Sequence, residues 1–268
     1  MSKYLVFIIL IFTCSVKSEQ VSDYYDNNSI LLKVEKDYVE KFISDICLDW
    51  RGETRTRKIS KNVNISFLED GSRGENYEIF LKSIKDINEA LGHEKLIPVA
   101  LSNPNKIYAD DHEIFIYYGS YSRGNMLLRH AGSLSAMTGW WGSWNHWDDN
   151  KNIIRSTISI DKGKVDGILL AYCLRRAILI PLGYPGSSKN YPANNLGASG
   201  LFNCSRIDAI LRNTPTGADD ESQLITEYDK AILRFAERYI ASNSSRADVR
   251  ENVQKNWGNF VLDFSNSK

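Results

Sequence analysis

Four tryptophans lie within one short segment, at Trp140, Trp141, Trp144 and Trp147. A tryptophan ring presents a large rigid face on which a sugar ring or a peptide can stack, and the flanking Asn145, Asp148 and Asp149 could bind sugar hydroxyl groups. Tryptophan is also usually well buried, so the same residues could instead cover a sheet edge and fill a core. The segment is a candidate binding surface for a protein or a carbohydrate polymer, with a structural role as the alternative.

The side chains of His130, His146 and Asp148 are of types that can hold a metal ion, because imidazole and carboxylate groups both ligate divalent metals. Their spacing matches no metal-binding motif, and lone histidines commonly have structural roles or are exposed. We predict no cofactor and no resident metal. If a metal binds, these three residues are the candidate ligands.

The most informative stretch is Val165–Leu182, which is apolar almost throughout and therefore typical of a helix buried in a core. Zinc proteases of the His-Glu-x-x-His type carry on such a helix two histidines that bind zinc and a glutamate that activates water. If Gly183 is the glycine that turns the chain away after this motif, the two histidine positions hold Arg176 and Ile180, and the glutamate position holds Ala177. No ligand and no base remain, and the charge of Arg176 would repel a metal ion.

Two arginines in an apolar helix need partners, because a buried charge is costly unless it is paired. Arg175 and Arg176 could form structural salt bridges with Asp166, Glu227 or Asp229. Alternatively, they could receive an anion, which makes Arg176 a second candidate binding residue.

Hydrophobic periodicity predicts the elements that position these residues. We expect strands at 63–67, 113–118 and 153–160, and helices at about 34–48 and 165–182. A further helix is expected to open with a capping box at Ser72–Glu75 and to stop at Gly92. Thr226 and Ser245 each begin a further helix, Ser245 the last one. The basic segment 51–61 is predicted to be an exposed loop, and residues 184–223 a long loop.

The stretch 173–183 begins with Cys-Leu and ends with Leu-Gly, and it resembles the signature helix of an uncharacterised bacterial family, the domain of unknown function 2927, which has a zincin-like layout. In that family the helix commonly reads Cys-Leu-x-Glu-Glu-x-x-Gln-x-Leu-Gly. A turn similar to Ser-Ile-Phe-Asn follows, then a helix with an aspartate. Here the turn is Ser199–Asn203 and the later segment is Leu224–Asp229.

The resemblance spans roughly residues 60–240 and implies a fold. This chain departs from the family where the family has its polar residues, since Arg176 and Ala177 replace the two glutamates and Ile180 replaces the glutamine. The resemblance therefore implies a divergent, degenerate zincin-like domain and no established activity.

Residues 1–18 have the pattern of a secretory signal peptide, with Lys3 before the apolar run Leu5–Phe12 and small residues Val16 and Ser18 before the expected cut. No later stretch is long and apolar enough to span a bilayer. The 33 basic and 33 acidic residues balance, so no basic excess indicates a nucleic-acid partner. We predict a secreted or periplasmic protein without a transmembrane segment after cleavage.

Cleavage of this signal would leave three cysteines, at Cys47, Cys173 and Cys204. Export makes a disulfide possible, and an odd count leaves one thiol unpaired. The sequence leaves the pairing open, including a bridge between Cys173 and Cys204.

These patterns together predict one α+β domain over residues 19–268, zincin-like but without the His-Glu-x-x-His motif, with helices at the C-terminus. The expected function is non-catalytic binding of a protein or of an envelope or extracellular polymer. One alternative is a metal-dependent hydrolase with a nonstandard site at His130, His146 and Asp148. Another is a structural component of the cell envelope.

Overall fold

The computed structural model describes residues 28–48, 55–59, 61–71, 75–101, 113–133, 137, 140–186, 201–202 and 224–265. The chain divides into two compact units, residues 1–41 and 42–268, and the second unit contains every described strand. The predicted signal peptide, residues 1–18, lies outside the described residues.

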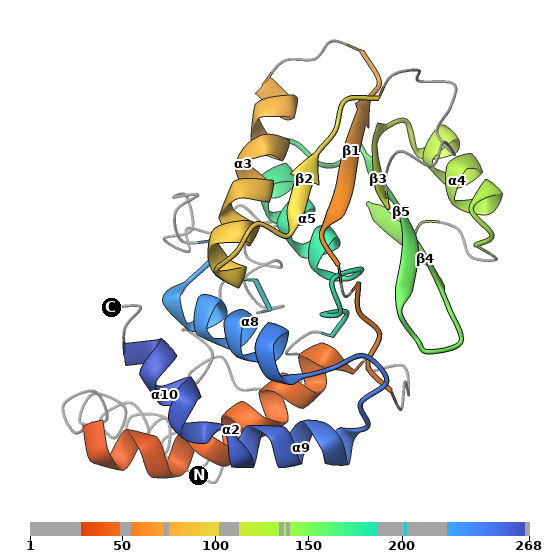
Figure 1. The fold of residues 1–268 in the computed structure, drawn as a ribbon. Helices are drawn as coiled ribbons and strands as arrows, with labels where there is room; N and C mark the ends of the chain where they lie inside the picture. The colour runs from red at the N-terminus through yellow and green to blue at the C-terminus, as the bar shows by residue number, and fades with distance from the viewer. Residues whose placement is uncertain are drawn as a thin grey trace, which may run out of the picture. The chain divides into compact units, whose positions relative to one another are not determined.

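A five-stranded mixed sheet forms the centre of the second unit (Figure 1). Its strands lie in the order β2-β1-β3-β5-β4, and the pairs β2–β1, β1–β3 and β3–β5 are parallel, whereas β4 is antiparallel to β5. The strands are β1 (Val63–Glu69), β2 (Leu96–Pro98), β3 (Ile114–Gly119), β4 (Trp141–Trp147) and β5 (Ile153–Asp161). The three predicted strands are confirmed as β1, β3 and β5.

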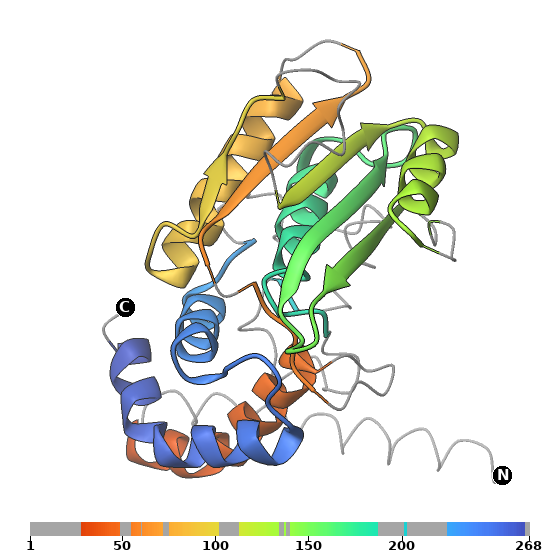
Figure 2. The same cartoon turned by 45° about the vertical axis from the view of Figure 1, so that its right-hand side comes forward.

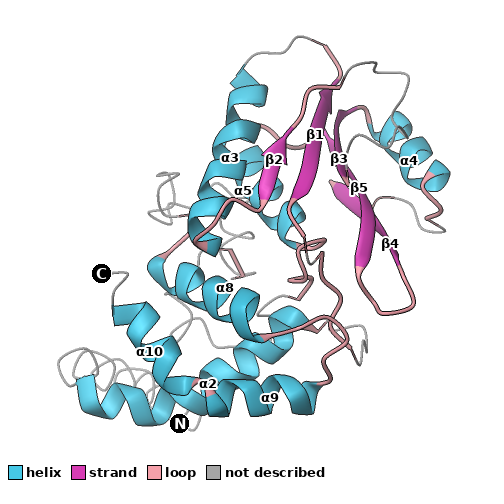
Figure 3. Ribbon diagram, in the orientation of Figure 1, coloured by secondary structure: helices cyan, strands magenta, loops and turns pink. Residues whose placement is uncertain are grey.

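The described helices are α2 (Asn28–Cys47), α3 (Glu75–Leu91), α4 (Tyr121–His130), α5 (Gly167–Leu179), α8 (Glu227–Tyr239), α9 (Arg246–Lys255) and α10 (Trp257–Ser265). Helix α3 lies between β1 and β2 in the chain, α4 lies between β3 and β4, and the remaining helices after β5 follow one another (Figure 3). With a mostly parallel sheet, this arrangement is of the α/β class. The prediction of mixed helices and strands with C-terminal helices is confirmed. The structure is α/β rather than α+β, because three of the four strand pairings in the described sheet are parallel.

Helices cover both faces of the sheet, with α3 and α5 on one face and α4 on the other (Figure 2). On the first face, the ring of Phe67 in β1 stacks on Phe80 of α3 at 4.9 Å between centroids. On the second face, Leu127 of α4 packs in a buried cluster with Phe115 and Tyr117 of β3. Consecutive residues of each strand therefore point alternately to the α3/α5 face and to the α4 face.

The basic segment 55–59 is not the exposed loop predicted from the sequence, because Thr56 and Lys58 are buried. The ammonium group of Lys58 donates to the carbonyl oxygens of Ala236 (2.9 Å) and Ile240 (2.6 Å) at the C-terminal end of α8. The Ile153 amide donates to the Lys58 carbonyl at 2.9 Å. Burial lowers the pKa of Lys58, and the nearby Glu237 carboxylate opposes that shift. The segment thus joins the start of β5 to the end of α8.

The predicted buried helix 165–182 is α5, which is shorter and ends at Leu179 with Ile180 as its cap. Gly183 lies in the turn that follows, and this turn requires a glycine. Its φ is +104°, a left-handed conformation that other residues adopt at a cost. A Cβ atom there would also lie 3.0 Å from the Arg57 carbonyl oxygen and against the Lys58 side chain. The backbone of segment 55–59 can approach the end of α5 only because residue 183 has no side chain.

We expect Gly183→Ala to lower the free energy of unfolding by about 1–3 kcal/mol, through backbone strain and the loss of this close approach. Gly258 in α10 is the matched control, because a Cβ there would meet nothing within 4 Å. Gly258→Ala should leave stability unchanged or raise it by about 0.4–1 kcal/mol. Chemical denaturation of both variants measures the difference, and equal stabilities would contradict this account of the turn.

Candidate functional site

Arg175 of α5 is fully buried and pairs with Asp86 of α3. Its Nε donates to Asp86 Oδ2 at 3.0 Å, and its Nη1 donates to the Ala171 carbonyl oxygen at 2.8 Å. The expectation of a structural ion pair is confirmed, but the partner is a residue that the sequence did not indicate. The pair fixes α5 against α3.

Arg176, the candidate anion-binding residue, donates to three backbone carbonyl groups in the turn that follows α5. Its Nη1 lies 2.8 Å from the Tyr184 oxygen, and its Nη2 lies 2.9 Å from the Pro185 oxygen and also contacts the Gly186 oxygen. The guanidinium carbon lies 5.3 Å from the centre of the Phe202 ring. Through these contacts Arg176 fixes the turn.

The other two positions of the expected zinc motif carry no ligand either. Ala177 is fully buried, and Ile180 is the residue at the C-terminal cap of α5. Among the residues that the structure describes, no group of three His, Cys, Asp or Glu side chains could hold a metal ion.

His130, His146 and Asp148 are not brought together by the fold. The Nε2 atom of His146 contacts the Ala131 carbonyl oxygen, which holds the end of α4 against β4. The carboxylate of Asp148 accepts from the Asn152 side chain (3.0 Å) and amide (2.8 Å), and these hydrogen bonds lower its pKa. Each contact stabilises the local structure at one end of the β4–β5 hairpin.

The turn and the later helix named in the family resemblance contact each other and α5. The buried carboxylate of Asp229 accepts from the amides of Leu201 (3.3 Å) and Thr226 (3.0 Å), and so caps α8 while holding the turn. The Tyr172 hydroxyl of α5 donates to the Leu201 carbonyl at 2.9 Å. Residues 199–200 and 203 of the same turn lie outside the described residues.

The tryptophans do not form one continuous platform. Trp141 is opposite Ile160 of β5, on the α3/α5 face, whereas Trp144 is opposite Thr157, on the α4 face. Trp147 lies 6.3 Å from Trp144 between ring centroids, is 39% exposed, and has the Arg57 guanidinium 3.9 Å from its own ring centre. Trp140 precedes the strand, and its carbonyl accepts from the Asp161 amide.

β4 lies at one edge of the sheet, with its outer backbone groups pointing away from β5. The Asp161 amide donates to the Trp140 carbonyl at 2.8 Å, which sets the phase of the antiparallel ladder. Because bonded pairs alternate with non-bonded pairs, the amides and carbonyls of Trp141, Ser143 and Asn145 face outward. Within the described part of the chain, none of these amides donates to another element.

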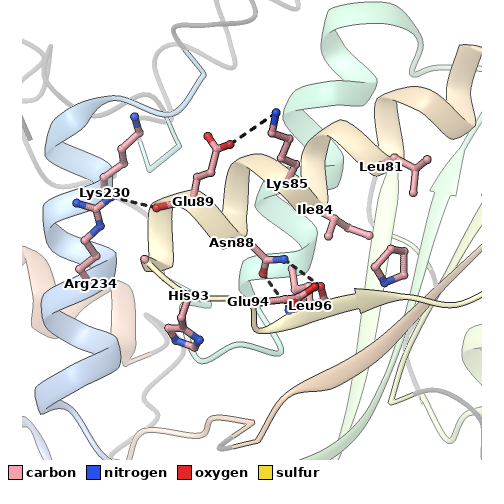
Figure 4. Close-up of a pocket in the computed structure, with 12 residues that line it drawn as sticks. Leu81, Ile84, Lys85, Asn88, Glu89, His93, Glu94, Leu96, Lys230 and Arg234 are labelled. Atoms are coloured by element: carbon pink, nitrogen blue, oxygen red, sulfur yellow. Dashed lines mark hydrogen bonds and ion pairs between the residues drawn. The ribbon is translucent and has the colours of Figure 1, made fainter.

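The opposite edge, β2, is blocked. Lys95 and Val99 make its bonds to β1, so the backbone of Leu96 and Pro98 faces outward. The Asn88 side chain of α3 bonds both the amide and the carbonyl of Leu96 at 2.9 Å (Figure 4), and Pro98 has no amide hydrogen. A further strand therefore cannot pair with β2, whereas no element that the structure describes prevents pairing with β4.

A groove of about 760 Å³ lies beside this blocked edge, between α3, β2 and α8. Its ionisable lining residues are Lys85, Glu89, His93, Glu94, Lys230 and Arg234 (Figure 4). Both signs of charge are present, and Lys85 lies 3.8 Å from Glu89. The lining therefore does not favour one class of charged ligand.

The structure determines the state of two of the three cysteines whose pairing the sequence left open. Cys47 and Cys173 are both free and buried, so the bridge between Cys173 and Cys204 is not formed. Burial raises the pKa of the Cys47 thiol to about 12 and raises that of Cys173 well above its usual value. Cys204 lies outside the described residues.

No family model, no curated protein and no solved structure matches this chain. The resemblance to the domain of unknown function 2927 therefore stays a prediction. None of the helices described is both long and apolar enough to cross a membrane.

The sequence analysis identified the tryptophans as candidate binding residues. It did not predict strand β4, which contains three of them, or the open edge of that strand. Residues 141–147 contain no proline and no Asp, Glu, Lys or Arg, which are the side chains that usually protect an edge strand. That composition was an available signal, but it becomes meaningful only once β4 is known to be at an edge.

We expect Arg176→Met to lower the free energy of unfolding by about 2–4 kcal/mol, because three carbonyl groups of the turn lose a charged donor. Arg129→Met is the control, since Arg129 is exposed at the end of α4 and should change stability by less than about 0.5 kcal/mol. Chemical denaturation compares the two. An Arg176→Met protein as stable as the control would remove the structural role assigned to Arg176.

Proposed function

We propose that this protein is a secreted or periplasmic, zincin-like protein without catalytic activity, and that it binds an extended segment of a partner protein along β4. Three features support the proposal, namely the order of elements, the altered positions of α5 and the unprotected edge of the sheet.

The order of elements supports the zincin-like part of the proposal. A strand (β1) and a long helix (α3) precede the other strands, and the buried helix α5 follows and leads into the turn at Gly183. The turn at Leu201 then contacts α8 through Asp229. This is the layout expected from the sequence, and in that layout α5 is the helix that would carry the zinc ligands.

The residues of α5 support the absence of zinc-protease chemistry. Arg176 directs its donors at backbone carbonyls, and Ala177 has no group that could activate water. In the hydrolase alternative the metal would need His130, His146 and Asp148 together, but two of these make separate structural contacts. Binding therefore requires fewer assumptions than hydrolysis.

The contrast between the two sheet edges carries the proposal. An unprotected edge strand is a site for unwanted pairing, and proteins normally block it with charges, proline or a covering element. This protein blocks β2 with Asn88 and Pro98 but leaves the outward groups of Trp141, Ser143 and Asn145 available. Addition of a strand to such an edge is a recurring mode of peptide recognition. The division of the tryptophans between two faces makes a flat sugar-binding platform a weaker alternative.

Ser143→Pro is the sharpest test, because the Ser143 amide faces away from β5. Proline there removes an outward donor and blocks close approach of a partner strand, while the bonds between β4 and β5 remain. Peptides selected from a random display library for binding to the wild-type protein serve as probes. We expect Ser143→Pro to weaken their binding at least about tenfold in fluorescence polarisation.

Ser143→Ala is the matched control, since it removes the same hydroxyl group but keeps the amide hydrogen, and its affinity should stay within about twofold of wild type. Hydrogen exchange gives a second measurement, in which peptide binding slows exchange of the Trp141, Ser143 and Asn145 amides. Unchanged affinity in Ser143→Pro, or the absence of any peptide that binds, would refute strand addition at β4.

We also expect the purified mature protein, prepared without chelator, to contain far less than one zinc atom per chain by elemental mass spectrometry. The reason is that the positions of the zinc motif hold Arg176, Ala177 and Ile180. Stoichiometric zinc would contradict the non-catalytic interpretation and would direct attention to His130, His146 and Asp148.

A further inference from the structure

The side chains of the outward-facing residues of β4 determine what a bound segment must carry. Trp141, Ser143 and Asn145 are opposite Ile160, Ile158 and Ser156, so their side chains lie on the α3/α5 face. A strand paired with their outward amides and carbonyls places one residue opposite each of them, with its side chain on the same face. Three alternate residues of the bound segment therefore lie beside the side chains of these three β4 residues.

Trp141 is half-buried, and its cross-strand neighbour in β5 is Ile160, which is fully buried. On the outer side, the next residue of the sheet would be supplied by the bound segment. Aromatic and β-branched residues pair favourably across strands with an aromatic residue. An apolar residue is thus the best partner opposite Trp141.

Asn145 has a different requirement. Its Oδ1 atom is buried and accepts no hydrogen bond among the described residues, and the same holds for the hydroxyl oxygen of Ser156 directly opposite in β5. Buried polar atoms in folded proteins nearly always have a partner, so each exception needs an explanation. Rotation of the half-buried Asn145 side chain would bring this oxygen to the outer edge. There a side chain with a hydrogen-bond donor, placed opposite Asn145 by the bound segment, would supply the missing hydrogen.

We infer that the segment recognised at β4 runs antiparallel to it and carries a hydrogen-bond donor side chain opposite Asn145 and an apolar residue four positions later, opposite Trp141. The inference rests on the proposed strand addition. The antiparallel direction follows from the greater stability per residue of antiparallel pairing. The partner is thus an extended polypeptide with an Asn, Gln, Ser or Thr residue followed at this spacing by Ile, Val, Phe or Tyr.

The test uses the tightest peptide from the library selection, substituted with alanine at one position at a time. We expect two positions, four residues apart, at which alanine weakens binding to the wild-type protein roughly two- to tenfold. A peptide with the same residues in reverse order should bind at least about tenfold more weakly than the original.

Double-mutant cycles then assign the two positions. In Asn145→Ala protein, removing the donor from the peptide should cause no further loss of affinity, and the apolar position should keep its full effect. In Trp141→Ala protein the pattern should be the opposite. If Trp141→Ala does not fold, the Asn145 cycle and the peptide substitutions in wild-type protein still decide the outcome.

The two levels of the proposal fail in different ways. In one outcome, Ser143→Pro abolishes peptide binding, but the double-mutant cycles show no coupling between the peptide positions and Asn145 or Trp141. That outcome would overturn the side-chain pattern and leave strand addition intact. Binding that Ser143→Pro does not affect would overturn both.

Discussion

The burial of two guanidinium groups in one helix is the constraint on which the rest of the domain depends. Arg175 binds Asp86 and so fixes α5 against α3, while Arg176 binds the carbonyls of residues 184–186. The Gly186 amide in turn donates to the Ile46 carbonyl at 2.9 Å. Removing one partner of a buried charge typically costs about 3–5 kcal/mol, so α5 cannot move independently of these neighbours.

A helix fixed in this way also fixes the sheet that it covers, including the two edges. The β2 edge is held by a side chain of α3, the helix to which Arg175 binds, so its protection depends on the same packing. The β4 edge has a different support, because His146 contacts the end of α4 and Trp147 lies beside Arg57. These contacts hold the strand from its α4 face and from its end, which leaves the outward backbone groups uncovered by any described element.

Local pattern predicted the parts of the fold that depend on nearby residues. Alternation indicated β1, β3 and β5, and the capping boxes at Thr226 and Ser245 begin α8 and α9 as expected. The sequence did not indicate that the helix begun at Ser245 stops at Asn256 and that α10 begins at Trp257. β4 was missed because Gly142, Ser143 and Asn145 have low strand propensity, and tertiary pairing with β5 overrides that preference.

The candidate site was harder to predict because its meaning depends on contacts between distant residues. Arg175 finds its partner 89 positions away in the sequence, so no local spacing could separate Asp86 from the acidic residues nearer in the sequence. The outward amides of β4 follow from its register against β5, which a one-residue slip would reverse. The residue types of the tryptophan segment were visible at once, but their division between two faces was not.

The proposed absence of zinc chemistry and the proposed binding at the β4 edge are physically compatible, because they depend on different groups. Strand addition takes its affinity from backbone amides and carbonyls, and these do not depend on the residues at positions 176, 177 and 180. Conversely, replacing Arg176 with a histidine would not recreate a metal site. The carbonyl groups of residues 184–186 would lose their donor, and the base position Ala177 and the second ligand position Ile180 would still be apolar. The turn after α5 therefore depends on Arg176 for its stability, and the proposed binding at β4 does not conflict with that dependence.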